Sequence, residues 1–281
     1  MNLIQIVVLS IVQGITEFLP VSSSGHLVIF EWLMGVTADQ ADVNIVLHFG
    51  TLLSIVIFYW QRIWQLLLND RRVLGLLGIG TVPAVIAGLI IKTQFEHWLE
   101  SPLLAGAMLP VTGALLLWVS GRDEGQEDYL SISWKVALLI GLFQALAILP
   151  GISRSGATIV AGLLMGMKRR SAATFSFLLA IPVMLGASLL ECKDIWSAHG
   201  ITTPIALLGL GAALSFAVGL FSLRWLVAWI EKGKLHYFAY WCIPVGVAVV
   251  VWQSFFAAPV DPAVTGSRAS SRAEILVESS H

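Results

Sequence analysis

A motif near the start of the chain recurs in altered form about 130 residues later, and this repeat limits the possible folds more than any other feature. Residues 13–26 read QGITEFLPVSSSGH, and residues 144–158 read QALAILPGISRSGAT. The prolines of the two copies align, as do Ser23 and Ser153. Proline, hydroxyls and glycine inside an apolar surround predict a helix that breaks at a polar turn and then restarts. In a membrane protein, two such breaks are expected to meet.

The composition indicates a polytopic membrane protein. Hydrophobic residues make up 57% of the 281 residues and charged residues 12%. Several uncharged runs reach about 18 residues, enough to span a bilayer, so the composition argues against a soluble protein. The formal net charge of -1 gives no indication of nucleic-acid binding.

Cys192 and Cys242 lack the spacing of a disulfide framework or a metal site, so we assign them no role. Met1–Leu19 lacks a charged start and a cleavage pattern, so we expect it in the mature protein.

Eight apolar regions define the expected architecture. Regions 3–35 and 134–167 are each cut near the middle by the repeated motif, so their halves are too short to span the bilayer comfortably. They are predicted to be re-entrant hairpins, whose irregular turns must face an internal site. Each hairpin is followed by three spans, and because three is odd, the second hairpin must enter from the opposite face. The six predicted spans are residues 43–60, 73–91, 103–120, 172–191, 204–223 and 236–257.

The predicted fold class is therefore an all-α polytopic membrane protein with an inverted repeat, each half holding one helix–turn–helix hairpin and three transmembrane helices. A single membrane domain is expected over residues 1–258, with repeats at about 1–130 and 131–258. Residues 259–281 mix Ser, Arg and Glu without periodicity, which predicts a mobile tail or a remnant of an expression vector.

Basic residues predict the orientation of these spans. Four connecting segments, 62–72, 121–135, 168–171 and 224–234, carry eleven lysines and arginines, whereas the short loops of the other face hold only Lys92 and Lys193. By the positive-inside rule the first set is cytoplasmic, so both termini and the mouth of the first hairpin are expected on the outer face. Tryptophans near the predicted span ends agree with an aromatic belt: Trp60, Trp64, Trp98, Trp118, Trp134, Trp196, Trp225 and Trp252.

The first turn combines an acid with hydroxyls. Gln13 and Glu17 lie four residues apart on one helix face, and a carboxylate at membrane depth is a candidate functional group because it needs a cation, an arginine or a proton. Ser22, Ser23, Ser24 and Gly25 then start a new helix, whose free N–H groups and dipole suit an anion, although serine-rich helix starts are also common as plain caps. His26 can reach the same pocket. His48, inside an apolar span, could equally pack in the core or line a cavity.

The second turn supplies a permanent cation. Arg154 stands between Ser153 and Ser155 at a helix start, with Thr158 four residues further on the same side. Arginine suits bidentate contact with phosphate oxygens. If the turns meet, one pocket holds an acid, a base, a nucleophile and helix N-termini. A divalent cation could bridge Glu17 and phosphate, since hard cations bind both kinds of oxygen.

At these residues the sequence closely resembles the undecaprenyl-pyrophosphate phosphatase family, also called bacitracin-resistance proteins. The match covers about residues 1–257 and rests on an E/Q-xxx-E segment leading into FLPVSSSGH, on PGxSRSxxT at 150–158 and on FSFLLAIP at 175–182. The resemblance implies removal of the terminal phosphate from undecaprenyl pyrophosphate to give the monophosphate lipid carrier of cell-wall synthesis. It also implies a divalent cation, Mg²⁺ or Ca²⁺, and a place in the bacterial inner membrane. The family often has glutamate at the position of Gln13, so a site with two carboxylate ligands is not expected here.

The residues together with this resemblance predict a membrane phosphatase whose pocket opens to the outer face, with a lipid partner and no nucleic acid. We assign Ser23 as the nucleophile and His26 as the general base and then acid. Arg154 is expected to stabilise the transition state together with the hydroxyls of Ser153, Ser155 and Thr158. Glu17 is expected either to bind the metal, with Gln13 as a second candidate ligand, or to orient His26. Attack by His26 or by a metal-bound water would use the same residues. The alternative is a transporter or flippase of polyprenyl phosphate lipid, since inverted repeats with broken helices are also transporter architecture.

Overall fold

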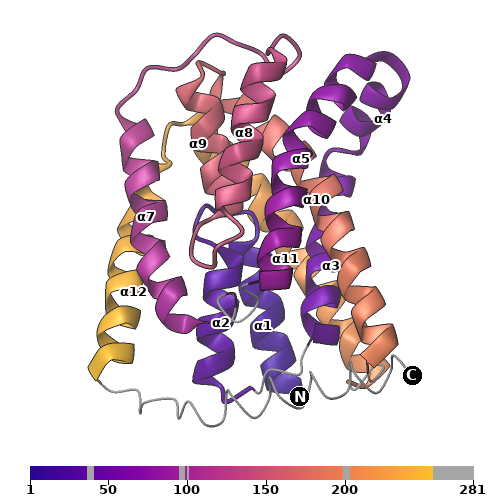
Figure 1. Ribbon diagram of the computed structural model, residues 1–281, viewed down its shortest axis with the longest axis vertical. Helices are drawn as coiled ribbons and strands as arrows, with labels where there is room; N and C mark the ends of the chain where they lie inside the picture. The colour runs from indigo at the N-terminus through magenta and orange to yellow at the C-terminus, as the bar shows by residue number, and fades with distance from the viewer. Residues whose placement is uncertain (37–40, 95–98, 100, 199–202, 256–281) are drawn as a thin grey trace. The chain divides into compact units, whose positions relative to one another are not determined.

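The computed structural model describes residues 1–36, 41–94, 99, 101–198 and 203–255, and these residues form eleven helices and no strand (Figure 1). Residues Met1–Val250 form one compact unit, to which the following description applies, and Val251–His281 form a second. The expected tail at 259–281 lies outside the described residues. The helices are α1 (Leu3–Thr16), α2 (Ser23–Leu33), α3 (Ala41–Phe58), α4 (Trp60–Asn69), α5 (Arg71–Gln94), α7 (Pro102–Ser120), α8 (Trp134–Leu146), α9 (Arg154–Leu164), α10 (Arg169–Ala198), α11 (Ile205–Glu231) and α12 (His236–Phe255).

The all-α membrane architecture expected from the sequence is confirmed. Each of the six predicted spans coincides with one helix: α3, α5, α7, α10, α11 and α12. Among the described residues, the last five are long and apolar enough to cross a membrane. The chain is therefore a multi-pass membrane protein.

The first predicted span differs from the others because it is part of a bent pair. Helix α3 ends at Phe58, and α4 begins at Trp60 after a bend of 68°. Helix α4 occupies residues that the sequence pattern predicts to be a charged connection between spans. One side of α4 packs inward, since Leu66 is buried, whereas Trp60 and Trp64 on the other side are exposed. Aromatic side chains on the outer face of such a helix suit the membrane interface.

The two interrupted regions form the two predicted helix–turn–helix hairpins. Helices α1 and α2 make the first and pack against each other, as do α8 and α9, which make the second. In Figure 1, the α1–α2 hairpin enters from the end that carries the N-terminus, and the α8–α9 hairpin enters from the opposite end. This arrangement, with α3, α5 and α7 after one hairpin and α10, α11 and α12 after the other, is consistent with an inverted repeat.

Hydroxyl side chains start the second helix of each hairpin. Ser22 caps α2 by accepting the Gly25 N–H at 3.3 Å, and Ser153 caps α9 by accepting the Gly156 N–H at 3.1 Å. Each cap satisfies a backbone donor that has no partner within the helix, which matters more in lipid than in water. Both motifs therefore start a helix with a serine cap, although the capping serines are not the aligned pair, because α2 begins at Ser23 and α9 begins one residue after Ser153.

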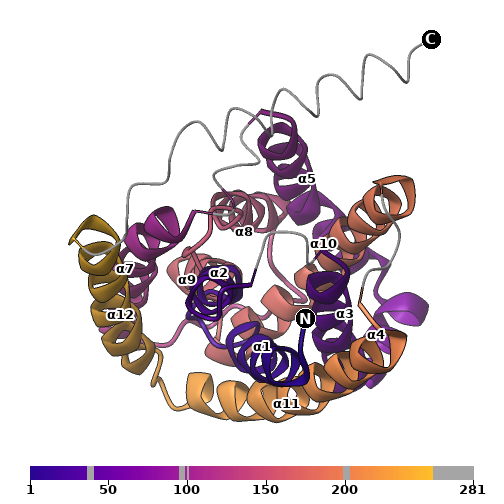
Figure 2. The same cartoon turned by 90° about the horizontal axis from the view of Figure 1, so that it is seen from below.

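Other helices surround three of the four hairpin helices. In the view from below, α1, α2 and α9 lie inside a surround that includes the longer helices α3, α7, α10 and α11, together with α8 of the second hairpin (Figure 2). Contacts between α1 and α11, α2 and α7, and α9 and α10 hold the hairpins in this surround. Helices α5 and α8 pack so closely that a Cβ atom on Gly141 would overlap the Gly80 carbonyl group. The turns of the hairpins are thus buried in protein, as irregular backbone at membrane depth requires.

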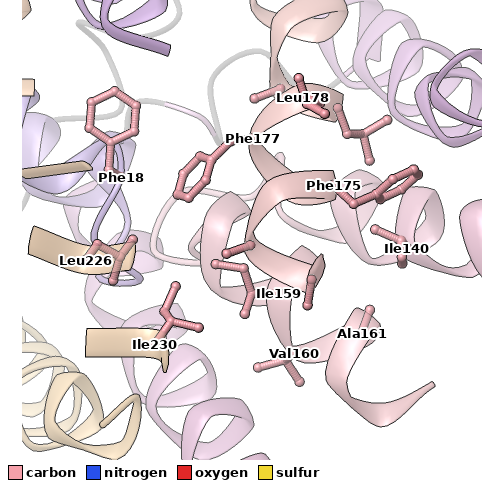
Figure 3. Close-up of a cluster of buried hydrophobic side chains, with 14 of the residues drawn as sticks. Phe18, Ile140, Ile159, Val160, Ala161, Phe175, Phe177, Leu178, Leu226 and Ile230 are labelled. Atoms are coloured by element: carbon pink, nitrogen blue, oxygen red, sulfur yellow. The ribbon is translucent and has the colours of Figure 1, made fainter. Parts of the chain in front are cut away.

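A cluster of buried apolar side chains connects the two halves (Figure 3). Phe18 in the first turn packs edge-to-face on Phe177 of α10, with ring centroids 5.9 Å apart. Ile159 and Val160 of α9, and Leu226 and Ile230 of α11, belong to the same cluster. Because water is absent from a lipid surround, this tight packing is expected to hold the helices together mainly by dispersion contacts. It also fixes the first turn against α10.

Candidate active site

The two predicted turns meet, and Ser22 joins them. Its hydroxyl oxygen accepts the Gly151 N–H at 3.1 Å in addition to the N–H of its own helix. Among the described residues, Ser22 is the only non-glycine residue with a positive φ, 70°. Such a backbone costs about 1–3 kcal/mol and persists only where its surroundings enforce it. A Cβ atom on Gly25 would lie 3.0 Å from Gly151 Cα, so the turns approach as closely as glycine permits.

Glu17 is the centre of the polar cluster between the turns. Arg154 donates from Nη2 to Glu17 Oε1 at 2.6 Å. Ser23 donates its hydroxyl to Glu17 Oε2 at 2.7 Å, and Gln13 Nε2 donates to the same oxygen at 3.2 Å. The Glu17 side chain is only 6% exposed, so its charge depends on these partners. A buried carboxylate is tolerable when a cation and several donors satisfy its oxygens. The structure therefore brings together Gln13, Glu17, Ser23 and Arg154, which the sequence had singled out.

Two polar atoms of this cluster lack a partner within the described part of the chain. Arg154 Nη1 is buried and donates no hydrogen bond, and Gln13 Oε1 is buried and accepts none. Buried polar atoms are nearly always satisfied, so unpaired ones beside a reactive group call for an explanation. A guanidinium group with free N–H donors next to a serine hydroxyl can hold an anion such as a phosphoryl group.

The remaining predicted hydroxyls bind the protein itself. Ser153 Oγ and Ser155 Oγ lie 3.1 Å apart, and Ser155 also donates to the Leu19 carbonyl at 3.3 Å. Thr158 donates to the Arg154 carbonyl at 2.8 Å, with Ser176 Oγ at 2.5 Å. Ser24 lies beside Ser22, with 3.3 Å between their hydroxyl oxygens. In this geometry these side chains fix the turns, while their predicted contact with substrate stays a prediction.

Thr112 of α7 takes part in the site although no motif in the sequence marks it. Its hydroxyl donates to the Gly151 carbonyl at 2.8 Å and accepts the Ser153 N–H at 2.9 Å. It therefore holds the second turn on both sides. A lone buried hydroxyl in an apolar span was the available signal, but such residues often bond only within their own helix.

His26 lies beside the cluster, but its ring nitrogens bind other groups. Nδ1 is 2.8 Å from the Ser22 carbonyl, and Nε2 accepts the indole N–H of Trp241 at 3.0 Å. The two rings are nearly parallel, with an interplanar angle of 14° and ring centroids 6.3 Å apart. The Ser23 hydroxyl, which was expected to bind His26, donates to Glu17 instead. The role of His26 as general base therefore stays a prediction, and Trp241 is a partner that the sequence did not reveal.

His48 of α3, which the sequence left between core packing and cavity lining, is close to Glu17. Its Nε2 lies 4.0 Å from Glu17 Oε2, and its Nδ1 lies 2.8 Å from the Asn44 carbonyl. Thr51, on the same helix, lies 3.4 Å from Gln13 Nε2. Helix α3 thus contributes polar groups to the site, although the motifs themselves lie on the hairpins.

The site offers a divalent cation only a small number of protein oxygen ligands. No group of three or more His, Cys, Asp or Glu side chains suited to a metal occurs within the described ranges. Glu17 Oε2 and the unpaired Gln13 Oε1 are oxygen ligands of the kind that Mg²⁺ and Ca²⁺ prefer. Magnesium commonly binds through one or two protein oxygens and takes its other ligands from water and substrate phosphates. The donor set is therefore compatible with a cation that arrives with a diphosphate.

Comparison with known proteins gives the same family over nearly the whole chain. Residues 6–248 match the family described as bacitracin resistance protein BacA. A protein of Rhodopirellula baltica named undecaprenyl-diphosphatase is 55% identical over 251 residues, which cover 89% of this chain and 98% of the relative. A protein of the same name from Halothermothrix orenii is 39% identical over 262 residues, covering 91% and 100%. On this evidence, the chain belongs to the bacitracin resistance protein BacA family.

Proposed function

We propose that this protein hydrolyses undecaprenyl diphosphate to undecaprenyl phosphate and inorganic phosphate, which recycles the lipid carrier of cell-wall synthesis and confers resistance to bacitracin. The observation that carries the proposal is the Glu17 carboxylate, which binds the Ser23 hydroxyl with one oxygen and the Arg154 guanidinium with the other. A nucleophile, a base and an oxyanion-binding cation thus share one buried site. The names of the relatives agree with this chemistry.

In the first step, Ser23 Oγ attacks the terminal phosphorus of the diphosphate. Its proton passes to Glu17 Oε2, which already accepts the hydroxyl at 2.7 Å. Arg154 Nη1 donates to a phosphoryl oxygen as negative charge develops there. The bond between the terminal phosphorus and the bridging oxygen breaks, and undecaprenyl phosphate leaves with that oxygen, which takes the proton from Glu17 and returns the carboxyl group to its charged form. We assign the base to Glu17 on this geometry, since His26 would have to leave Trp241 to take the same proton.

We further propose that a divalent cation, Mg²⁺ or Ca²⁺, is held by Glu17 and Gln13 oxygens when the substrate is bound. It would neutralise part of the charge on the diphosphate. Within the protein, Gln13 also donates to Glu17 Oε2 and so keeps this oxygen directed toward Ser23.

The expected outcome of a direct assay is release of phosphate from undecaprenyl diphosphate by the purified protein in lipid. A chelator is expected to lower the rate, because the diphosphate would then enter the site without its counter-charge. Phosphate is measured with and without chelator, followed by added Mg²⁺. A protein that binds the lipid but releases no phosphate under any of these conditions would be a transporter of the lipid instead.

We propose that the protein lies in the bacterial inner membrane with both termini and the opening of the site on the outer face. Figure 1 supports this orientation, because the connection between α7 and α8, which holds Arg122, lies at the end opposite to the N-terminus. We expect Ser101→Cys, before α7, to react with a membrane-impermeant thiol reagent in intact cells, and Gln126→Cys, after α7, to react only in opened cells. Asp39, a third suitable position, lies outside the described residues.

Both variants need a background in which Cys192 and Cys242 are replaced, because these are free thiols. Labelling of both positions from the same side would contradict the orientation, since one span, α7, separates them.

A further inference from the structure

His48 is held in one tautomer by its own helix. Its Nδ1 lies 2.8 Å from the Asn44 carbonyl oxygen, one turn earlier in α3. A carbonyl oxygen only accepts hydrogen bonds, so Nδ1 carries the hydrogen and donates it. In the neutral ring, Nε2 is then an acceptor with a free lone pair. The Asn44 contact therefore fixes both the ring orientation and the character of Nε2.

The lone pair of His48 Nε2 faces another acceptor. Glu17 Oε2 lies 4.0 Å away, which exceeds the length of a direct hydrogen bond. Two acceptors do not bond to each other, but both can accept from one water molecule placed between them. The His48 side chain is 33% exposed and the Glu17 side chain 6%, so His48 lies on the more accessible side of the pair. A water molecule held in this way has both hydrogens engaged and a lone pair free to attack.

The same carboxylate oxygen changes partners during the proposed reaction. Glu17 Oε2 accepts the Ser23 hydroxyl at 2.7 Å before the first step. Once Ser23 carries a phosphoryl group, its oxygen has no hydrogen to donate, and Oε2 loses that partner. The proton that Oε2 took from Ser23 has left with undecaprenyl phosphate, so the oxygen is then free to accept a hydrogen from water, next to the phosphorus that this water must attack.

We propose that His48 and Glu17 together bind the water that hydrolyses phosphorylated Ser23, the second half of the reaction. This inference rests on the proposed function and on Ser23 as nucleophile. The water oxygen bonds to phosphorus and the bond between phosphorus and Ser23 Oγ breaks. The water proton passes to Glu17 and then to the departing Ser23 Oγ, which restores the hydroxyl. His48 orients the water through Nε2 and is needed only in this half.

The test separates the two halves by rapid quenching of His48→Leu protein with undecaprenyl diphosphate. We expect steady-state phosphate release to fall by about tenfold to a hundredfold, as for loss of a positioning contact at the reacting atom. The first equivalent of undecaprenyl phosphate should still form at the wild-type rate, and phosphate should accumulate covalently on Ser23. A purely structural role for His48 would slow both halves together.

Two further variants control the result. His236→Leu removes a histidine that packs on Tyr237 at the start of α12 and should behave as wild type. His48→Gln keeps an acceptor oxygen at a similar reach and should restore part of the second step. Equal slowing of both halves, or an unchanged rate in His48→Leu, would overturn the role of His48 while leaving phosphatase activity intact. Absence of phosphate release in wild-type protein would instead remove the proposed function.

Discussion

Ser23→Ala protein is expected to bind undecaprenyl diphosphate but to release phosphate at least about a thousandfold more slowly than wild type, on the scale of removing a nucleophile. Alanine cannot form a bond to phosphorus, whereas the Arg154 guanidinium and the starts of α2 and α9 remain in place to bind the substrate. Phosphate release and lipid binding are measured on the same reconstituted protein. Wild-type protein quenched during turnover should carry an acid-stable phosphate on Ser23.

The stability of the trapped phosphate distinguishes Ser23 from the other candidate nucleophiles. Attack by His26 would give an acid-labile phosphate, and Ser23→Ala would then only slow the reaction. Attack by a metal-bound water would give no covalent phosphate in any variant. Ser24→Ala is a matched control, since its hydroxyl lies next to Ser23 in sequence but bonds Ser22 rather than Glu17. Wild-type turnover in Ser23→Ala would exclude Ser23 as nucleophile.

Arg154→Lys protein is expected to lose about two orders of magnitude in activity, comparable to removal of one transition-state donor, although the positive charge is kept. The guanidinium uses Nη2 for Glu17 at 2.6 Å and leaves Nη1 for substrate. A lysine presents one nitrogen on a flexible stem, so it can neutralise Glu17 or bind phosphate but does not hold both in a planar fork. The turnover number with undecaprenyl diphosphate is the measurement.

Arg170→Lys provides the control for charge and size. Its side chain is 79% exposed and pairs with Glu231 at 3.4 Å, outside the site, so this variant should keep wild-type turnover. Thermal unfolding of both variants in detergent verifies that they are folded. Wild-type turnover in folded Arg154→Lys protein would exclude the proposal that the guanidinium must bind Glu17 and phosphate at the same time.

The sequence was sufficient to predict the membrane architecture because spans and hairpins are set by local signals. Length of apolar runs located the spans, and the interruption at Pro20 and Pro150 located the two turns. The expectation that the turns meet in one pocket followed from the requirement that irregular backbone at membrane depth be buried. The direct ion pair between Glu17 and Arg154 was not predicted, because Glu17 was assigned to a metal or to His26. The bend of 68° between α3 and α4 was not predicted, because no proline or glycine separates Phe58 from Trp60.

The partners of the two histidines could not be deduced from the sequence. Spacing places His26 one turn after Ser23, but it does not reveal that Trp241 of α12 occupies Nε2. Likewise, a histidine in an apolar span gives no sign that its Nε2 faces a carboxylate of another helix. Side-chain direction across helix interfaces depends on packing angles that local patterns leave open. Thr112 was missed for the same reason.

The strained backbone of Ser22 has a consequence for how the two halves of the chain depend on each other. Its hydroxyl binds Gly151, so the unusual φ is supported by a residue that belongs to the other repeat. Either half expressed alone would hold the nucleophile without its cation or the cation without its nucleophile. It would also lack the partner that stabilises this turn. Separately produced halves should therefore be inert until they associate, and activity would report on assembly itself.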